Sequence, residues 1–221
     1  MKKTLLSLAV ASLVCASMAE ARLFVGVEGG YTAQKSYDTG LNNRASTFLF
    51  SMPSTSVISD ALDKGSKGYS LGVTLGTEDV GSIFGTRWYL GAGYTSVSKD
   101  FAGKSWSREY IDASVGFDLI LNFFNNGSSS FGIFGGVSAD YHYWLNSSDY
   151  KEEYFATFSK HIFDFSGKAG ITTMLAKHNR LEVFAKLPIA SMSITDSKEA
   201  ILGGNHSPAN VTFGASYKFI F

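Results

Sequence analysis

The sequence lacks the features that mark helical membrane proteins and disulfide-rich domains. Cys15 is its single cysteine, and after Met18 no apolar run approaches the roughly 18 residues that a membrane-spanning helix needs. If the chain is cut before Arg22, no cysteine remains. A disulfide framework and a thiolate zinc site are then excluded, as are helical membrane spans.

The sequence also lacks a surplus of either charge. It has 19 basic and 19 acidic residues, and loss of Lys2, Lys3 and Glu20 with a leader would leave 17 and 18. Proteins that bind nucleic acid carry a strongly basic surface, so no nucleic-acid partner is predicted.

The first 21 residues have the layout of a secretory signal peptide. Lys2 and Lys3 precede an apolar run at 4–18, and small residues lead to a cleavage site between Ala21 and Arg22. The run is shorter than the roughly 20 residues of a membrane span. A lipoprotein anchor at Cys15 is disfavoured because a bulky residue stands where a small one should precede the cysteine. We therefore expect a signal peptide at 1–21 and a mature chain at 22–221.

Glycine and aromatic residues are abundant, and the end of the chain alternates strictly. There are 23 glycines, and 14% of the residues are aromatic. The apolar positions of 210–221 are Val211, Phe213, Ala215, Tyr217, Phe219 and Phe221, and Ile220 alone breaks the pattern. A period of two predicts a strand with one apolar and one polar face. We expect lipid to cover the apolar face, and in lipid only a closed sheet satisfies every backbone group.

Seven further segments alternate in the same way. They span residues 23–33, 67–77, 86–97, 108–121, 131–143, 162–174 and 180–190. The eight segments predict an all-β fold, a closed eight-stranded antiparallel up-and-down transmembrane β-barrel. Pro188 has no N–H to donate, so we expect the seventh strand to end or bulge there.

The connections between these segments alternate in length. The four longer ones lie at about 34–66, 98–107, 144–161 and 191–209. Outer-membrane barrels have longer extracellular loops and tight periplasmic turns. We therefore predict a place in the outer membrane of a Gram-negative bacterium, with both termini in the periplasm. Within 34–66, Ser56 and Asp60 indicate a short amphipathic helix.

With this pattern the mature chain resembles the small outer-membrane barrels of the OmpA transmembrane domain, OmpX and opacity-adhesin type. It is also similar, to a lesser degree, to the outer-membrane proteins of Helicobacter-like bacteria. Tyr217, Phe219 and Phe221 are similar to the C-terminal signal that the barrel assembly machinery recognises. The resemblance implies a fold, a location and that assembly partner, but no activity.

The inward face carries an unusual number of charges. They are Glu28, Arg87, Asp112, Asp118, Asp140, Lys168, Glu182, Lys186 and Lys218. An eight-stranded barrel encloses an interior that side chains can fill, so we expect a hydrogen-bonded plug. By strand direction Arg87 would face Asp118, and Glu182 would face Lys218. The alternative is a gated path for ions or small solutes.

A lipid A-modifying enzyme is the distant alternative. Ser138, Asp140 and His142 share one face of one strand, but that face points inward, where a lipid ester could not reach it. His161 and His178 show no spacing that suggests a metal. No catalytic residue, cofactor or metal site is therefore predicted.

The predicted loops are the remaining place for function. The first contains more apolar residues than a solvated loop needs, and we expect it either to pack over the barrel mouth or to contact a partner. The sequence thus predicts a non-enzymatic surface protein that acts in envelope integrity or adhesion. Its expected partners are outer-membrane lipid, lipopolysaccharide and a possible host or envelope ligand at the loops.

Overall fold

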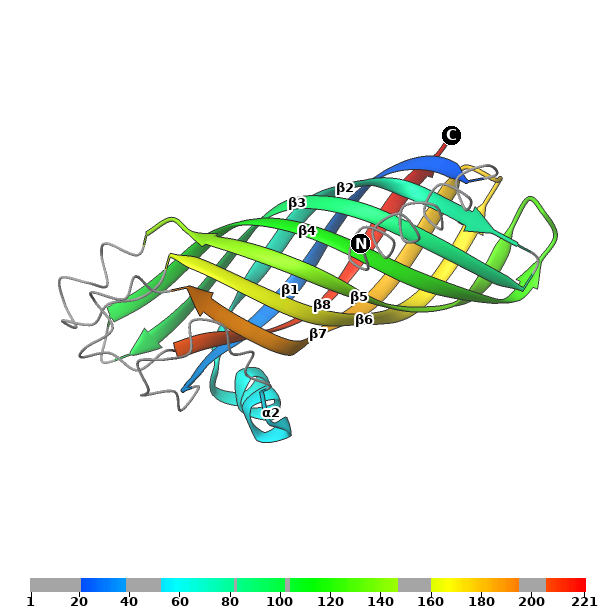
Figure 1. The fold of residues 1–221 in the computed structure, drawn as a ribbon. Coiled ribbons are helices and arrows are strands. Elements are labelled where there is room, and N and C mark those ends of the chain that lie inside the picture. The colour runs from blue at the N-terminus through cyan, green and yellow to red at the C-terminus, as the bar shows by residue number, and fades with distance from the viewer. Residues whose placement is uncertain (1–20, 39–52, 82, 102–103, 147–159, 195–205) are drawn as a thin grey trace, which may run out of the picture.

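In the computed structural model of the protein, eight strands form a closed barrel (Figure 1). The structure describes residues 21–38, 53–81, 83–101, 104–146, 160–194 and 206–221. The strands are β1 (Arg22–Asp38), β2 (Ser66–Val80), β3 (Phe84–Phe101), β4 (Lys104–Asn125), β5 (Ser130–Trp144), β6 (His161–Leu175), β7 (Asn179–Ile194) and β8 (His206–Ile220). Each strand is antiparallel to its neighbours, and β8 pairs with β1 to close the sheet. The predicted fold class and number of strands are confirmed.

Two ends of the barrel are distinguished below. At the terminal end the chain enters β1 and leaves β8, and β2 turns into β3. At the loop end lie the connections that follow β1, β3, β5 and β7. Figure 1 shows the C-terminus and the helix of the first long connection at opposite ends of the barrel.

The alternation in sequence decides which side chains face outward. Leu90 on β3 and Val183 on β7 are 62% and 66% exposed, whereas their inward neighbours Tyr89 and Phe184 are buried. The exposed apolar band is what a lipid-facing wall requires, and the polar residues lie inside.

The strands run further than the apolar alternation predicts. β2 reaches Val80, so Glu78 is a strand residue and not part of a turn. The connection expected at about 98–107 is largely strand, since β3 ends at Phe101 and β4 begins at Lys104. Polar residues continue the hydrogen-bonded ladder there, and a search for apolar alternation does not detect them.

Pro188 lies at a bulge within β7. Phe165 of β6 pairs with Ala190, and Ser166 pairs with Pro188, so Ile189 has no opposite residue. The extra residue accommodates the missing N–H, and the strand continues to Ile194. Of the two outcomes expected at this proline, the bulge is confirmed.

The predicted helix in the first long connection is α2 (Thr55–Lys64). It ends at Gly65, whose N–H donates to the Ala61 carbonyl at 3.2 Å. A Cβ atom at this position would collide with the carbonyl oxygens of Ala61 and Gln34, so only glycine fits there. No helix among the described residues has the length and apolar character to cross a bilayer.

Candidate functional site: the barrel interior and its outer-wall helix

Arg87 lies at the centre of the first interior network, near the terminal end. Its Nε and one terminal nitrogen lie 2.9 and 2.6 Å from the same oxygen of Asp118. Its other terminal nitrogen lies 2.5 Å from Glu182. Lys218 also donates to Glu182, as does the Ser216 hydroxyl at 3.0 Å. The structure thus contains both contacts expected from strand direction, Arg87 with Asp118 and Glu182 with Lys218.

Aromatic rings enclose this network. The guanidinium carbon of Arg87 lies 5.1 Å from the centre of the Phe134 ring and 6.0 Å from that of Phe24. Phe134 also packs with Ile120 and Phe184. Charged hydrogen bonds and ring contacts therefore fill the cross-section of the lumen at this level, which desolvates every member of the network.

A second buried ion pair lies closer to the terminal end. Arg180 Nε lies 3.0 Å from Glu78 Oε2, and both side chains are fully buried. Arg180 also donates to Thr172 at 2.8 Å, and Arg22 approaches Glu78 at 3.5 Å. Neither Glu78 nor Arg180 is among the predicted interior charges. Glu78 lies beyond residue 77, the predicted end of its strand, whereas Arg180 begins the predicted segment 180–190 and has the same inward phase as Glu182.

The middle of the lumen holds two lysine–carboxylate pairs. Lys168 donates to Glu28 at 2.8 Å, and its ammonium nitrogen lies 4.0 Å from the centre of the Phe184 ring. Lys186 donates to Asp140 at 2.7 Å. All nine predicted interior charges thus lie in the lumen and take part in ion pairs or hydrogen bonds.

Inward glycines provide the space for these side chains. A Cβ atom at Gly116 would overlap the Tyr89 ring, and one at Gly214 would lie 2.7 Å from Phe184. At Gly136 it would overlap the Asp118 carboxylate. Large side chains on one strand therefore occupy the volume that glycine leaves on the next.

His142 joins two carboxylates in the loop half of the lumen. Its Nδ1 lies 2.6 Å from Asp112, and its Nε2 lies 3.3 Å from Asp164. A ring that is protonated on both nitrogens donates to both carboxylates, whereas a neutral ring can donate to only one. Thr95 also donates to Asp112 at 2.6 Å. Asp164 is absent from the predicted interior charges although its strand phase is inward.

This region contains a cavity of about 80 Å³. The titratable side chains that line it are Glu28, Asp112, Asp140, His142, Asp164 and Lys186. Gly72, Gly91 and Gly93 also line it, and Gly72 directly pairs with Glu28 and Gly93 with Asp112. Glycines thus lie beside charged residues of the neighbouring strands, and their missing side chains leave part of the cavity volume.

Apolar and amide side chains narrow the lumen at the loop end. Val97, Tyr110, Trp144 and Ile162 form a buried cluster. Beside it the Gln34 side chain donates to Asn210 at 2.8 Å and accepts from Tyr110 and Arg108, both at 3.2 Å. The cavity thus lies between this layer and the Arg87 network.

The residues considered for an enzyme do not form a catalytic set. Ser138 donates to Asp140 at 3.0 Å, and Asp140 accepts from Lys186. His142 instead faces Asp112 and Asp164. Ser138 and His142 are four residues apart on one strand, about 13 Å. A nucleophile and its base must be within hydrogen-bonding distance, so these two residues cannot act as a pair.

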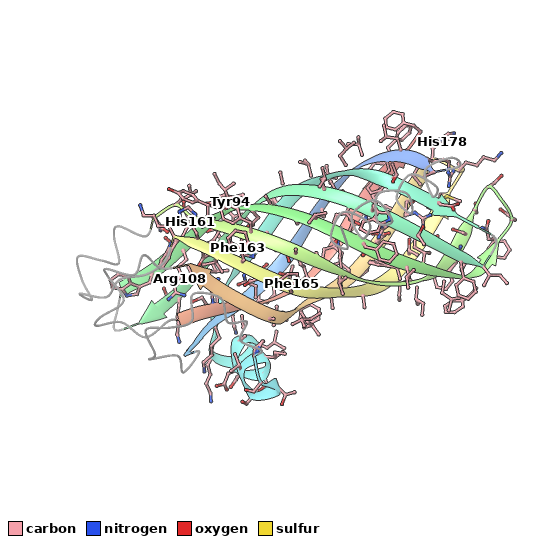
Figure 2. All side chains as sticks on the ribbon, in the orientation of Figure 1. Tyr94, Arg108, His161, Phe163, Phe165 and His178 are labelled. Atoms are coloured by element: carbon pink, nitrogen blue, oxygen red, sulfur yellow. The ribbon has the colours of Figure 1, made fainter. Side chains whose placement is uncertain are left out.

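His161 and His178 lie outside the lumen. His161 accepts from or donates to Tyr141 at 2.7 Å, and His178 makes a hydrogen bond of 2.7 Å with the carbonyl of Ile220. Figure 2 shows His161 with Tyr94 and Phe163 near the loop end and His178 at the terminal end. Within the described ranges, no group of three or more His, Cys, Asp or Glu side chains is arranged to hold a metal ion.

The helix α2 lies on the outer wall of the barrel, against β1 and β8 (Figure 1). Ala61 faces this wall and is fully buried, as are Ala33 of β1 and Val211 of β8. Asp60 accepts from Lys35 of β1 at 2.5 Å, and this hydrogen bond lowers the pKa of the Asp60 carboxyl from its ordinary value of 3.8. Of the two expected placements of the first loop, packing over the barrel mouth does not hold for this helix.

The residues predicted to serve export and assembly lie at the terminal end. Tyr217, Phe219 and Phe221 face outward and are 39%, 41% and 61% exposed. Arg22 is the first residue of β1. Cleavage between Ala21 and Arg22, and recognition of the terminal aromatic residues by the assembly machinery, stay predictions.

Comparisons with known proteins give a family and several similar structures. Residues 67–221 match the sequence profile of a family described as Helicobacter outer membrane protein. Neisserial surface protein A is 12% identical over 90% of this chain and 97% of its own, with a TM-score of 0.46. OprG of Pseudomonas aeruginosa is 17% identical over 92% and 98%, with a TM-score of 0.42. Ail of Yersinia pestis, in complex with a heparin analogue, is 12% identical over 89% and 99%, with a TM-score of 0.36. No curated protein sequence matches this chain.

Proposed function

Because this chain belongs to the Helicobacter outer membrane protein family, we propose that it is a non-enzymatic surface protein whose lumen is closed to ions. In this proposal the barrel anchors the long loops and α2, which act in envelope integrity or adhesion. Both termini lie in the periplasm, a leader at 1–21 is removed, and lipid and lipopolysaccharide surround the wall.

The observation that carries the proposal is the Arg87 network. Arg87, Asp118 and Glu182 have no exposed side-chain surface, and rings lie beside the guanidinium. An ion that crossed this level would have to break charged hydrogen bonds that no water replaces, which costs several kcal/mol. The network therefore supports a plug rather than the lining of a pore.

Conductance in a planar bilayer tests the closed lumen. We expect the full mature chain to give no steady conductance, because the network blocks the path. The matched variant is Arg87→Ala with Asp118→Asn and Glu182→Gln, which removes the charged hydrogen bonds at that level; we expect it to give small channel events. A steady current through the wild-type barrel would contradict the proposal.

A narrow channel is the second candidate, and the interior cavity is the observation in its favour. The loop half of the lumen already contains open volume beside charged groups. A channel needs that volume to continue past Arg87 to the terminal end. The bilayer measurement above decides between the two candidates, since only the channel predicts current without substitution.

The surface role rests on the position of α2 and the long connections at one end. A variant in which residues 53–64 are replaced by a glycine–serine linker of equal length keeps the barrel and removes the helix. If the protein supports the envelope, cells with this variant should admit a large antibiotic that intact outer membranes exclude. If it is an adhesin, the same cells should lose binding to host matrix instead. Wild-type behaviour in both assays would contradict the proposed role of this helix.

A further inference from the structure

We propose that the cavity in the loop half of the lumen binds a small monovalent cation beside the side chain of Asp164. This inference goes beyond the surface role proposed above and does not depend on it. The cation would be held by oxygen atoms and by water that fills the rest of the cavity.

The first step is the charge around the cavity. Four carboxylates line it, from Glu28, Asp112, Asp140 and Asp164. They face the ammonium groups of Lys168 and Lys186 and the imidazole of His142. If His142 is protonated, these groups carry four negative and three positive charges, so one negative charge is not balanced. On Asp164, which is 2% exposed, a negative charge is costly unless a counterion accompanies it.

The second step identifies where positive charge is missing. Asp164 is 2% exposed and lines the cavity, yet its Oδ1 has no hydrogen-bond partner among the described residues. Ser191 is its direct partner across β6 and β7. The Ser191 hydroxyl is fully buried and is also without a hydrogen bond in the described part of the chain. Of these two residues only Asp164 lines the cavity, so its oxygen is the one placed to hold a cation.

The third step concerns the class of cation. Carboxylate and hydroxyl oxygens bind hard cations, whereas imidazole and thiolate favour transition metals. Calcium takes six to eight oxygen ligands and several carboxylates, and three of the four carboxylates here already serve His142, Lys168 or Lys186. One carboxylate oxygen and water match Na⁺ or K⁺. A cavity of about 80 Å³ accommodates such an ion and a few waters.

Glycines that line the cavity leave volume for the ion. Gly72 of β2 directly pairs with Gly93 of β3, and neither side chain enters the lumen. A Cβ atom at Gly72 would lie 3.6 Å from the Glu28 side chain, so even alanine would reduce the open space. Gly72 and Gly93 thus leave room for a ligand here, as Gly116 and Gly136 leave room for large side chains elsewhere.

Urea unfolding of the full mature barrel in detergent, with the cation exchanged at constant ionic strength, tests the proposal. N-methylglucamine, which is too large for the cavity, is replaced stepwise by Na⁺ or K⁺. A ligand that binds only the folded state raises the folded-to-unfolded ratio about tenfold at ten times its Kd. We expect the midpoint to rise with small cations and then level off.

Asp164→Asn keeps the shape of the side chain and removes its charge, so we expect the cation dependence to disappear. Asp100→Asn removes the same charge from an exposed position on β3 and should respond as the wild type does. Equal midpoints in all three cations, or an unchanged response of Asp164→Asn, would overturn the proposal.

Crystals grown with Rb⁺ or Tl⁺ give a readout that does not depend on stability. Anomalous scattering next to Asp164 is the expected result. Crystals in which these ions bind only at the surface of the barrel would refute the site, whatever the unfolding data show.

Discussion

Arg87 and Arg180 are the two largest fully buried side chains among the described residues, and each forms an ion pair with a carboxylate. Each has a partner on a distant strand, since Arg87 of β3 pairs with Glu182 of β7 and Arg180 of β7 pairs with Glu78 of β2. Strand pairing accounts for Arg87 with Asp118, which are opposite each other on β3 and β4. The contact with Glu182 crosses the lumen, and only the packed interior reveals it.

Replacement of Arg87 by Met should strongly destabilise the barrel. Asp118 would lose its cation, and Glu182 would keep only Lys218, so two desolvated carboxylates would be under-compensated. Loss of one partner of a buried pair costs about 3–5 kcal/mol. Urea unfolding in detergent measures this difference. Arg22→Met is the control, because Arg22 is partly exposed and its pairing contributes about 0–1 kcal/mol. Equal losses for the two variants would contradict a desolvated network.

Glycines on the two faces of the wall should differ in their tolerance of a methyl group. Gly116→Ala would push against the enclosed Tyr89 ring, and overpacking of this kind costs about 1–3 kcal/mol. Gly135→Ala is the matched substitution on the outer face, where nothing lies within 4 Å of the new atom. We expect its free energy of unfolding to stay within about 0.5 kcal/mol of the wild type. A larger loss at Gly135 than at Gly116 would reverse the assignment of faces.

At the scale of elements, a period of two predicts the eight strands and the face of each residue. It does not predict their ends. Lys99 and Asp100 extend β3 beyond the apolar band, where a polar residue on either face satisfies the ladder equally well. Glu78 lies beyond such an end and is therefore not predicted, whereas Arg180 lies within the predicted segment 180–190. The bulge at Pro188 was predictable because proline removes a specific hydrogen bond.

For the helix α2, the sequence predicts that it exists but not where it packs. Its existence was predictable from Ser56 and Asp60, and it begins one residue before Ser56. Its docking on the outer wall was not, because Ala33 and Val211 resemble other lipid-facing residues of β1 and β8. Only the structure shows that Ala61 covers this part of the wall.

The attachment of α2 should weaken in acid. Asp60 has a lowered pKa because Lys35 donates a hydrogen bond to its ionised form. The ion pair therefore favours the docked helix at pH values above 3.8, and this contribution is lost as the pH falls through the lower pKa of the docked state. A spin label at Ser59, which is exposed, should become more mobile over that range. In Lys35→Met the label should show the same mobility at every pH, and a pH response that persists in this variant would implicate another group.

At the scale of the whole molecule, the family and the closed barrel place the protein in the outer membrane. The direction of insertion is a prediction that labelling in intact cells can test. Single cysteines at Ser54, Gly103, Ser148 and Asn205 should react with a membrane-impermeant thiol reagent. Cysteines at Asn126 and Lys177, in the turns of the terminal end, should not. The reverse pattern would place the termini outside.

The position of α2 has a consequence for the order of events during assembly. The helix precedes β2 in the chain, but the surface it covers is shared by β1 and β8, the first and last strands. That surface is complete only when the two ends of the sheet have met. In the variant Ala61→Cys, the thiol would stay reactive throughout synthesis and transport. It would become protected only when β8 pairs with β1. Burial of residue 61 against the wall therefore reports the moment at which β1 and β8 pair.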